Sequence, residues 1–332
     1  MSAADLVPAG LVDLASARLG GVALLANDEF FAEKENLLQP GRGIFIPDKY
    51  TDHGKWMDGW ETRRRRTPGH DWCIVQLGLR GVVQQVDIDT NHFLGNHPPF
   101  ASLDALRLTS NLPTNPDELA WQSILKKSPL APGAQNLFEI TSEECWTHLR
   151  LNIFPDGGVA RLRVFGRVVP DWGKLEPDAL LDLAAIENGG VPLACSDMFF
   201  SSMNNLIMPG RSENMGDGWE TKRRRGPGHD WIILQLGRPG TIRKIEVDTN
   251  HFKGNYPDTC SIAGCVAPGA SPDDLSSDAA KWKELLPITK LQADTRHFFG
   301  PELALLENCT HLLLNIYPDG GVSRLRAWGT PA

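Results

Sequence analysis

The sequence predicts a mainly β protein made of two tandem β-sandwich domains, each with one short helix. Three observations support this fold class. The chain has 332 residues, about twice the usual size of a domain, and 56 of them (32 glycine and 24 proline) are turn formers. Long blocks of sequence occur twice. Short apolar runs that end at glycine or at a turn lie within and between these blocks, as is typical of strands.

Composition excludes several classes of protein. Apolar residues make up 41% and charged residues 22%, which is the balance of a globular protein and not of a disordered chain. A long helical bundle is disfavoured, because each interior glycine or proline destabilises a helix. The net charge of −8 argues against a protein that binds nucleic acid. No apolar stretch approaches the length of about 20 residues that a membrane span requires.

The N-terminus and the cysteines both favour a cytoplasmic protein. The first ten residues contain no lysine or arginine, whereas a signal peptide begins with a basic segment. The six cysteines include no C-x-x-C pair, and none has a cysteine at the matching position of the other repeat. A disulfide framework inherited by duplication would occur twice, so we expect reduced thiols.

The chain is a tandem duplication. Residues 58–72, DGWETRRRRTPGHDW, return as residues 217–231 with 13 of 15 positions identical. Two further blocks return in the same order: 89–96 (DTNHFLGN) at 248–255, and 151–163 (LNIFPDGGVARLR) at 314–326. The offset of about 160 residues is far longer than a solenoid unit, so each copy is expected to be a whole domain. We predict a first domain at 1–166, a linker at 167–177 and a second domain at 178–332.

The strands and turns repeat with the blocks. The β-rich runs at 72–78 and 231–237 end at glycine, and residues 82–90 alternate apolar and polar side chains from residue 86 onward. The segments at 161–165 and 324–328 alternate in the same way. Between strands, Pro-Asp-Gly-Gly at 155–158 and at 318–321 predicts a turn in each copy.

One helix is expected in each domain. Asn115 opens the first as an N-cap, followed by proline and, three residues on, by Glu118. Ser271 and Asp274 repeat this pattern in the second domain.

The arginine run is the first candidate binding segment. Four arginines in an acidic chain without aromatic platforms are a poor nucleic-acid site. Guanidinium groups bind carboxylates in a bidentate way that lysine cannot reproduce. Arg63 corresponds to Lys222 in the second copy, so position 63 is the weakest candidate for binding a ligand carboxylate. The other three positions are arginine in both copies: Arg64, Arg65 and Arg66, matched by Arg223, Arg224 and Arg225. In a strand, alternate arginines would face opposite sides. An inter-domain salt-bridge network is the alternative.

Two further repeated segments carry polar side chains. His70 and His229 follow a Pro-Gly turn and precede an aspartate, so either imidazole is a candidate general base, with a structural histidine as the alternative. Residues 89–96 and 248–255 follow a predicted strand, where loops commonly hold ligands, and their Asp, Asn and His side chains suit an amide-like ligand. The alternative is that they form turns that stabilise the loop itself.

The sequence gives only a weak indication of a metal site. His70, His92, Asp89 and Asp58 offer nitrogen and oxygen ligands, but there is no H-x-x-x-H or H-E-x-x-H pair. The usual nucleotide-binding glycine motifs and the G-x-S-x-G elbow are also absent.

The repeated motifs resemble the allantoicase (allantoate amidinohydrolase) family. The resemblance rests on residues 41–66, on the PGHDW and DTNHFLGN segments and on their second copies, and it covers essentially the whole chain. It implies hydrolysis of allantoate to ureidoglycolate and urea in purine degradation, and two galactose-binding-like jelly-roll domains. It also implies a homo-oligomer, trimeric or hexameric. The sequence requires no cofactor, although a divalent metal such as manganese is compatible with the family.

Allantoate is a small anion with a carboxylate and two ureido groups on one carbon. Its hydrolysis needs guanidinium groups for the carboxylate, acceptors and donors for the ureido groups, and an acid and a base. We assign proton transfer to the histidines and aspartates of the repeated segments: His70, Asp89, His92, His229, Asp248 and His251. We assign substrate binding to Glu61, Arg64, Arg65, Arg66, Asn91, Asn96, Glu220, Arg223, Arg224, Arg225, Asn250 and Asn255. Whether one repeat or both is catalytic stays open, and a non-catalytic carbohydrate-binding protein is the alternative function.

Overall fold

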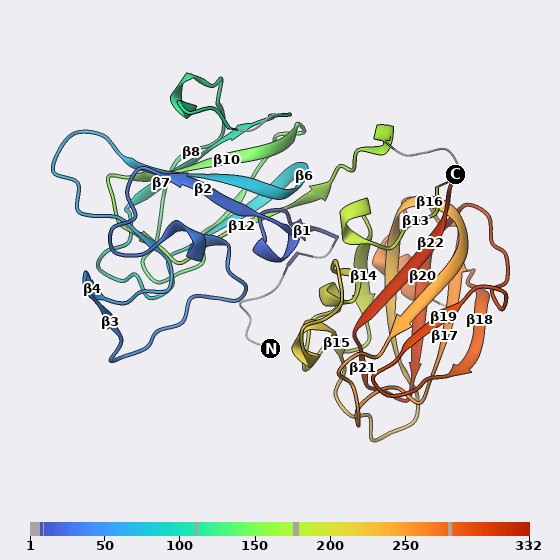
Figure 1. The fold of residues 1–332 in the computed structure, drawn as a ribbon. Coiled ribbons are helices and arrows are strands. Elements are labelled where there is room, and N and C mark those ends of the chain that lie inside the picture. Colours follow the sequence, from blue (N-terminus) through green and yellow to red (C-terminus); the bar gives the residue numbers. More distant parts are fainter. Residues whose placement is uncertain (1–6, 9, 110–111, 175–178, 278–280) are drawn as a thin grey trace. The chain divides into compact units, whose positions relative to one another are not determined.

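The computed structural model describes residues 7–8, 10–109, 112–174, 179–277 and 281–332. Contacts divide the chain into two compact units, residues 2–169 and 170–332. The regular secondary structure of both units is mostly strand, which confirms the predicted mainly β fold (Figure 1). Residues 175–177 of the predicted linker, and residue 178 at the predicted start of the second domain, lie outside the described residues.

The first unit contains twelve strands among its described residues: β1 (Val12–Asp13), β2 (Val22–Ala26), β3 (Tyr50–Thr51), β4 (Gly54–Lys55), β5 (Trp60–Glu61), β6 (Asp71–Asp89), β7 (Phe100–Leu106), β8 (Gln122–Pro129), β9 (Leu137–Glu139), β10 (Cys145–Phe154), β11 (Gly158–Val159) and β12 (Arg161–Val168). Its short 3-10 helices are η2 (Ala17–Leu19), η3 (Lys34–Leu38) and η4 (Pro116–Glu118). Between Arg42 and Trp60 the first copy is ten residues longer than the second. The hairpin of β3 and β4 lies in this longer segment.

The second unit repeats these elements: β13 (Leu181–Asp182), β14 (Val191–Cys195), β15 (Trp219–Glu220), β16 (Asp230–Asp248), β17 (Thr259–Cys265), β18 (Lys283–Lys290), β19 (Arg296–Phe299), β20 (Cys309–Tyr317), β21 (Gly321–Val322) and β22 (Arg324–Pro331). Its helices are η5 (Trp172–Lys174), η6 (Ile186–Asn188), η7 (Met203–Ile207), η8 (Met215–Asp217) and α1 (Pro272–Ser276).

The two main sheets have the same topology. The order is β1-β12-β6-β10-β7-β8 in the first unit, where β2 and β9 also pair with β6. In the second unit it is β13-β22-β16-β20-β17-β18, where β14 and β19 also pair with β16. All of these pairs are antiparallel, so the duplication seen in the sequence is a duplication of the whole fold.

Strand β6 joins the two halves of the first sandwich. The sequence predicted two strands here, at 72–78 and 82–90, and the structure has one strand across both. Its first half pairs with β10 and its second half with β12. A glycine lies in the middle, where a Cβ atom on Gly78 would come 2.4 Å from the carbonyl oxygen of Leu19. The strand therefore continues through a close backbone approach that the sequence pattern cannot distinguish from a break.

Both ends of β6 meet the same turn. The amide of Asp71 donates to the carbonyl of Pro155 at 3.1 Å, and the amide of Ala160 donates to the carbonyl of Asp89 at 2.7 Å. The Pro-Asp-Gly-Gly segment was predicted as a turn and lies, as expected, between β10 and β12. The repeated blocks are therefore gathered at one end of the first sandwich, and the same bonds recur at Asp230 in the second.

A short helix follows the predicted cap in both domains, α-helical in the second and 3-10 in the first. Ser271 and Asp274 form a capping box at the start of α1. Asn115 also caps, accepting from the amide of Asp117, but the turn that follows is a 3-10 helix of three residues. Strand β8 begins four residues after η4 ends, whereas β18 begins seven residues after α1 ends.

The core of each sandwich is apolar. Trp60 and Trp219, which stand at equivalent places in the repeated block, are fully buried, as are Phe93 and Phe252. All six cysteines are unpaired. Among the described residues, no helix is long and apolar enough to cross a membrane.

Candidate active site

The arginine run of the first repeat is an irregular segment after β5, and not a strand. Its arginines nevertheless alternate in their contacts. The Nε of Arg63 lies 2.7 Å from Oδ2 of Asp28, and Nη1 of Arg65 lies 2.7 Å from Oδ1 of Asp71. The other two are exposed and have no ion-pair or hydrogen-bond partner among the described residues: Arg64 and Arg66.

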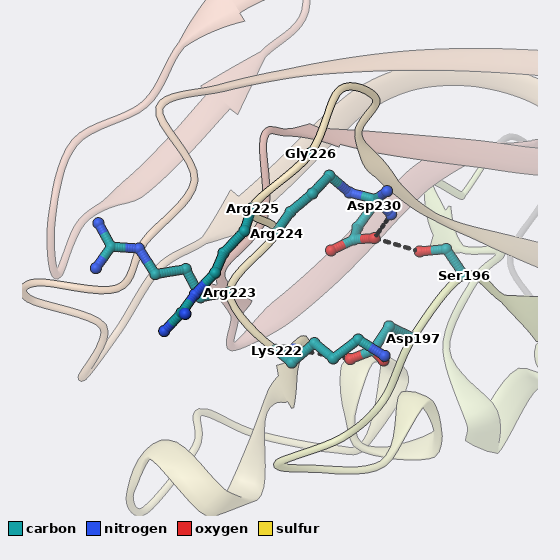
Figure 2. A pocket seen from close by; sticks show the side chains of 8 residues that line it. All are labelled: Ser196, Asp197, Lys222, Arg223, Arg224, Arg225, Gly226 and Asp230. Carbon is teal, nitrogen blue, oxygen red and sulfur yellow. Dashed lines mark hydrogen bonds and ion pairs between the residues drawn. The ribbon is translucent and has the colours of Figure 1, made fainter.

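The second repeat shows the same alternation. The Nζ of Lys222 lies 3.1 Å from Oδ2 of Asp197, and the guanidinium of Arg224 pairs with the carboxylate of Asp230. Figure 2 shows the remaining two arginines of the run directed away from these carboxylates: Arg223 and Arg225. Within the described part of the chain they have no partner.

A cavity of about 320 Å³ lies beside the second run. Its lining comes from the loop after β14, the basic run and the start of β16: Ser196, Asp197, Lys222, Arg223, Arg224, Arg225, Gly226 and Asp230 (Figure 2). Two carboxylates and four cations leave the lining with a net positive charge, which suits an anionic ligand. Of the residues predicted from sequence, the three arginines of this repeat line the cavity, whereas His229, Glu220 and the residues of 248–255 do not.

Buried aspartates hold the basic run in place. Asp71 is 2% exposed and also accepts a hydrogen bond from the amide of Asn27 at 2.9 Å. Asp230 is 1% exposed and accepts from the hydroxyl of Ser196 at 2.9 Å. A buried carboxylate needs such partners, because an unpaired charge in the interior is costly. From the sequence, these aspartates stand out only as neighbours of His70 and His229.

A second aspartate in each repeat fixes the other paired cation. Burial opposes ionisation of Asp28, but hydrogen bonds from the Phe30 amide and from Arg63 outweigh burial and lower the pKa of its carboxyl. Asp197 has a lowered pKa for the same reasons, with Lys222 in place of the arginine. The lysine therefore replaces an arginine that makes a structural ion pair. This agrees with the expectation that Arg63 is the weakest ligand anchor.

Glycines make room for the paired arginines. Gly69 has φ +130°, and a Cβ atom there would come 2.9 Å from Nη2 of Arg65. Gly228 has φ +108°, and its Cβ would come 3.3 Å from Nη1 of Arg224. The repeated Pro-Gly-His-Asp segment thus needs glycine both for its backbone conformation and for the guanidinium that packs on it.

The two candidate histidines have matching surroundings. The Nε2 of His70 lies 3.3 Å from Oδ1 of Asn152, and its ring packs on Phe154 with centroids 4.6 Å apart. The Nε2 of His229 lies 3.1 Å from Oδ1 of Asn315, and its ring packs at 4.6 Å on an aromatic residue, Tyr317. Sequence reasoning missed both asparagines, although each lies in a repeated block that was quoted for its turn.

Glu61 and Asn96 are brought together as a pair. The amide of Asn96 donates to Oε1 of Glu61 at 2.6 Å, and the matching pair in the second repeat is Glu220 with Asn255. Burial raises the pKa of both glutamates, although the hydrogen bond from each asparagine lowers it in part. A carboxyl that holds its proton more tightly than usual is suited to proton donation.

The aspartates at the ends of β6 and β16 make structural contacts. Asp89 is 2% exposed and receives two hydrogen bonds from Arg42, at 2.9 and 3.0 Å. Asp248 is fully buried and contacts Arg211. Each also accepts from the backbone amide two residues on, at 2.9 Å, which is the turn that was the alternative interpretation. Their predicted part in proton transfer stays a prediction without support from these contacts.

The other residues of this segment also bind the loop. The side-chain amide of Asn91 donates to the carbonyl of Gly43 at 2.7 Å, and Asn250 donates to the backbone of Ser212 at 3.2 Å. The remaining pair has positive φ angles of 68° and 70°: His92 and His251. The Nε2 of the second lies 2.9 Å from the Ser212 carbonyl, so it is engaged as well. Their assigned roles in ureido binding and proton transfer also stay predictions.

Three of the four residues that the sequence offered as metal ligands already contact other side chains. Asp58 pairs with Arg161 at 2.8 Å and Asp89 with Arg42, so both carboxylates already have cationic partners. His70 directs Nε2 at an asparagine. In the part of the chain that the structure describes, no three His, Cys, Asp or Glu side chains are grouped closely enough to hold a metal ion.

Comparison with known proteins shows the family to which the chain belongs. Both units match the family model described as "Allantoicase repeat", over residues 12–169 and 181–332. A probable allantoicase 1 of Burkholderia mallei is 52% identical over 319 residues, which cover 96% of this chain and 94% of that protein. A probable allantoicase of Pseudomonas aeruginosa is 50% identical over 320 residues, with 96% of each chain covered. The crystal structure of allantoicase from Saccharomyces cerevisiae is similar with a TM-score of 0.83 and 38% identity, over 98% of this chain and 95% of that one. The chain therefore belongs to the allantoicase family.

Proposed function

We propose that this protein hydrolyses allantoate to ureidoglycolate and urea. The observation that carries the proposal is the alternation in the basic run, where two cations are paired with aspartates and two arginines are left unpaired in each repeat. Membership of the allantoicase family supports the choice of substrate.

The unpaired arginines form the carboxylate clamp of the proposed site. Asp28 and Asp71 fix the neighbouring side chains, and the carboxylate of Asp156 accepts from the backbone amide of Arg65 at 2.8 Å. The same backbone contact joins Arg224 to Asp319 at 2.9 Å. A run held at its backbone and at alternate side chains presents the two remaining guanidinium groups in a limited range of positions, which lowers the entropic cost of binding. These pairs are Arg64 with Arg66, and Arg223 with Arg225.

The ureido groups need both donors and acceptors. The Glu61–Asn96 pair supplies a carboxyl and an amide three residues from the first clamp, and Glu220–Asn255 supplies them near the second. We assign to one of these glutamates the proton that the departing urea nitrogen requires, because burial raises the pKa of both.

The reaction exchanges one C–N bond for one C–O bond. The bond between the central carbon and one ureido nitrogen breaks, and that nitrogen takes a proton and leaves as urea. The oxygen of water bonds to the carbon, and the water proton passes to the imidazole of His70 or of His229. Urea leaves first through an imine, or water displaces it directly. Both orders give ureidoglycolate.

The tryptophans that open the charged segments give no support to the carbohydrate-binding alternative. Sugar-binding surfaces present exposed aromatic rings, whereas Trp60 and Trp219, which open the charged segments, are fully buried. We also propose a cytoplasmic homo-oligomer, trimeric or hexameric, that works without added metal. Sedimentation velocity on the purified protein would measure the assembly.

Urea release from allantoate by the purified protein tests the function. We expect turnover that is the same with a chelator as without it, and the same after manganese is added. An Arg64→Ala, Arg66→Ala, Arg223→Ala, Arg225→Ala variant is the control, because it removes both clamps and keeps the paired cations. No urea from the wild-type chain under any of these conditions would refute the assignment. Turnover lost to the chelator and restored by manganese would refute the metal-free reading.

A further inference from the structure

The side chain behind His70 decides which ring nitrogen carries the proton. The Nε2 of His70 lies 3.3 Å from Oδ1 of Asn152, which is an acceptor. We propose that Asn152, held by Asp104, is a positioning residue that keeps neutral His70 protonated at Nε2. The Nδ1 atom is then the nitrogen that takes the proton from water. This inference rests on the proposed function, because it gives the base of that reaction its orientation.

The orientation of Asn152 follows from its other contacts. Its Nδ2 donates to Oδ2 of Asp104 at 2.9 Å and to the hydroxyl of Ser102 at 3.1 Å. An ionised carboxylate only accepts, so the amide nitrogen must face Asp104 and the amide oxygen must face the imidazole. The Nη2 of Arg150 lies 3.3 Å from the same carboxylate oxygen and provides its counter-charge. Asn152 is 3% exposed, so water does not compete for these bonds.

Packing also limits the orientation of the His70 ring. It packs on Phe154 with centroids 4.6 Å apart, which limits rotation of the imidazole. His70 is half-buried, and its Nδ1 has no hydrogen-bond partner among the described residues. That nitrogen is therefore available to a water molecule at the site, as a general base requires.

The second repeat lacks the carboxylate. Ala263 pairs with Leu313 in the register in which Asp104 pairs with Arg150. The Nδ2 of Asn315 instead donates to the hydroxyl of Ser261 at 3.2 Å, and that hydroxyl lies 3.0 Å from the hydroxyl of Tyr317. A hydroxyl both donates and accepts, so it does not force the orientation of the amide. The structure therefore assigns the strictly oriented base, and with it proton transfer, to the first repeat.

The Asp104→Asn variant tests the proposal. An amide at position 104 can donate to Oδ1 of Asn152, which lets Asn152 turn over and present Nδ2 to His70. We expect the ¹⁵N NMR signals of the His70 ring, assigned with a His70→Gln sample, to show the proton moving from Nε2 to Nδ1. We also expect kcat for allantoate to fall at least about tenfold, with KM changed less than about twofold, because a misplaced base loses the rate gain of proton transfer.

Two matched variants serve as controls. Asp117→Asn removes the other ion pair of Arg150, at 3.0 Å, without touching Asn152. Ser261→Ala removes the acceptor behind Asn315 in the second repeat. We expect wild-type kcat and an unchanged His70 tautomer in both. If Asp104→Asn does not fold, as judged by thermal unfolding, Asn152→Ala gives the same two readouts.

The outcomes separate the two proposals. A His70 ring that stays protonated at Nε2 in Asp104→Asn overturns the inference, and so does a changed tautomer with unchanged kcat. A loss of kcat in Ser261→Ala alone also overturns it, because proton transfer would then belong to the second repeat. If the wild-type chain releases no urea, the proposed function fails, and the tautomer measurement alone decides whether Asn152 orients His70.

Discussion

The two repeats have similar site loops but differ in the side chains around Arg150 and around its counterpart, Leu313. In the first, Arg150 lies between Asp104 and Asp117, at 3.3 and 3.0 Å, and its guanidinium carbon is 5.1 Å from the ring centre of Trp121. In the second, the matching position is Leu313, which packs on an apolar cluster that includes Leu193, Ile233, Cys265 and Leu275. A charged network and an apolar cluster therefore support the same loops.

This difference shows which parts of the site depend on one another. The pairing of alternate cations with aspartates is the same in both repeats, so it does not depend on the face behind it. The partner of the asparagine behind each histidine does differ, because Asp104 belongs to the charged network, whereas its counterpart Ala263 pairs with Leu313 and has no polar side chain. Anion binding is thus expected in both repeats, and strict orientation of the base in the first.

Removing the clamps one repeat at a time should have the largest effect. We expect Arg64→Ala with Arg66→Ala to lower kcat/KM for allantoate by about 10²–10⁴, since each of the two lost charged hydrogen bonds costs about 1.5–3 kcal/mol. The same change at Arg223 and Arg225 should cost less than tenfold. Arg63→Ala is the control within the run and should stay within about threefold. A larger loss from the second pair would place the substrate in the second repeat.

Truncating the apolar cluster should test its structural role. Leu275 on α1 is 2% exposed, so Leu275→Ala is expected to cost about 2–4 kcal/mol of stability through lost burial and a cavity. Asp117→Ala changes a residue of η4, and we expect less than about 1 kcal/mol because that carboxylate is mostly exposed. Differential scanning calorimetry of the full chain measures both. Equal losses would mean that the charged and apolar networks are equally stabilising.

The glycines beside the paired arginines should differ in their tolerance of alanine. Both have positive φ angles, and we expect Gly69→Ala and Gly228→Ala each to cost about 1–3 kcal/mol. Gly69→Ala should cost more, because its Cβ would lie 2.9 Å from the guanidinium against 3.3 Å in the second repeat. Thermal unfolding of the two variants gives the order. The reverse order would mean that the arginine moves aside freely.

A carboxyl near the end of β6 should give the smallest effect, and one that depends on pH. Burial raises the pKa of Asp87 to about 6, and hydrogen bonds from Gln135 and Asn136 offset this only in part. The fold therefore favours the protonated form, so its contribution is fully present below about pH 4 and is lost as the pH rises through 6. We expect Asp87→Asn to be about 1–2 kcal/mol more stable relative to wild type at pH 7.5 than at pH 4. A stability difference that does not change with pH would contradict this.

The sequence predicted the fold class better than it predicted the elements. The duplicated blocks and their turns were enough for two β domains, because repeats and turn residues are local signals. The continuous β6 was missed, since a glycine that lets Leu19 approach looks like a glycine that ends a strand. The cap at Asn115 was predicted correctly, but the sequence did not show that the helix after it is a 3-10 helix of three residues.

The site was predicted in part for similar reasons. The arginine run and His70 stand out in the sequence because of their residue types. In the structure, alternate arginines pair with aspartates and His70 contacts Asn152. The aspartates that pair with alternate arginines come from other loops, so only tertiary structure shows which arginines are left unpaired. Asn152 reads as an ordinary strand residue until its partner across the sheet, Asp104, is known.

Strand β6 also bears on how each domain folds. Both ends of β6 hydrogen-bond to the turn that follows β10: Asp71 to Pro155, and Asp89 to Ala160. The partners in each pair are more than 60 residues apart in sequence. Contacts of such large separation form late and slowly. The loops of the candidate site are therefore expected to assemble in the last steps of folding. An anion that binds them would act on the finished domain and slow its unfolding, without accelerating its formation.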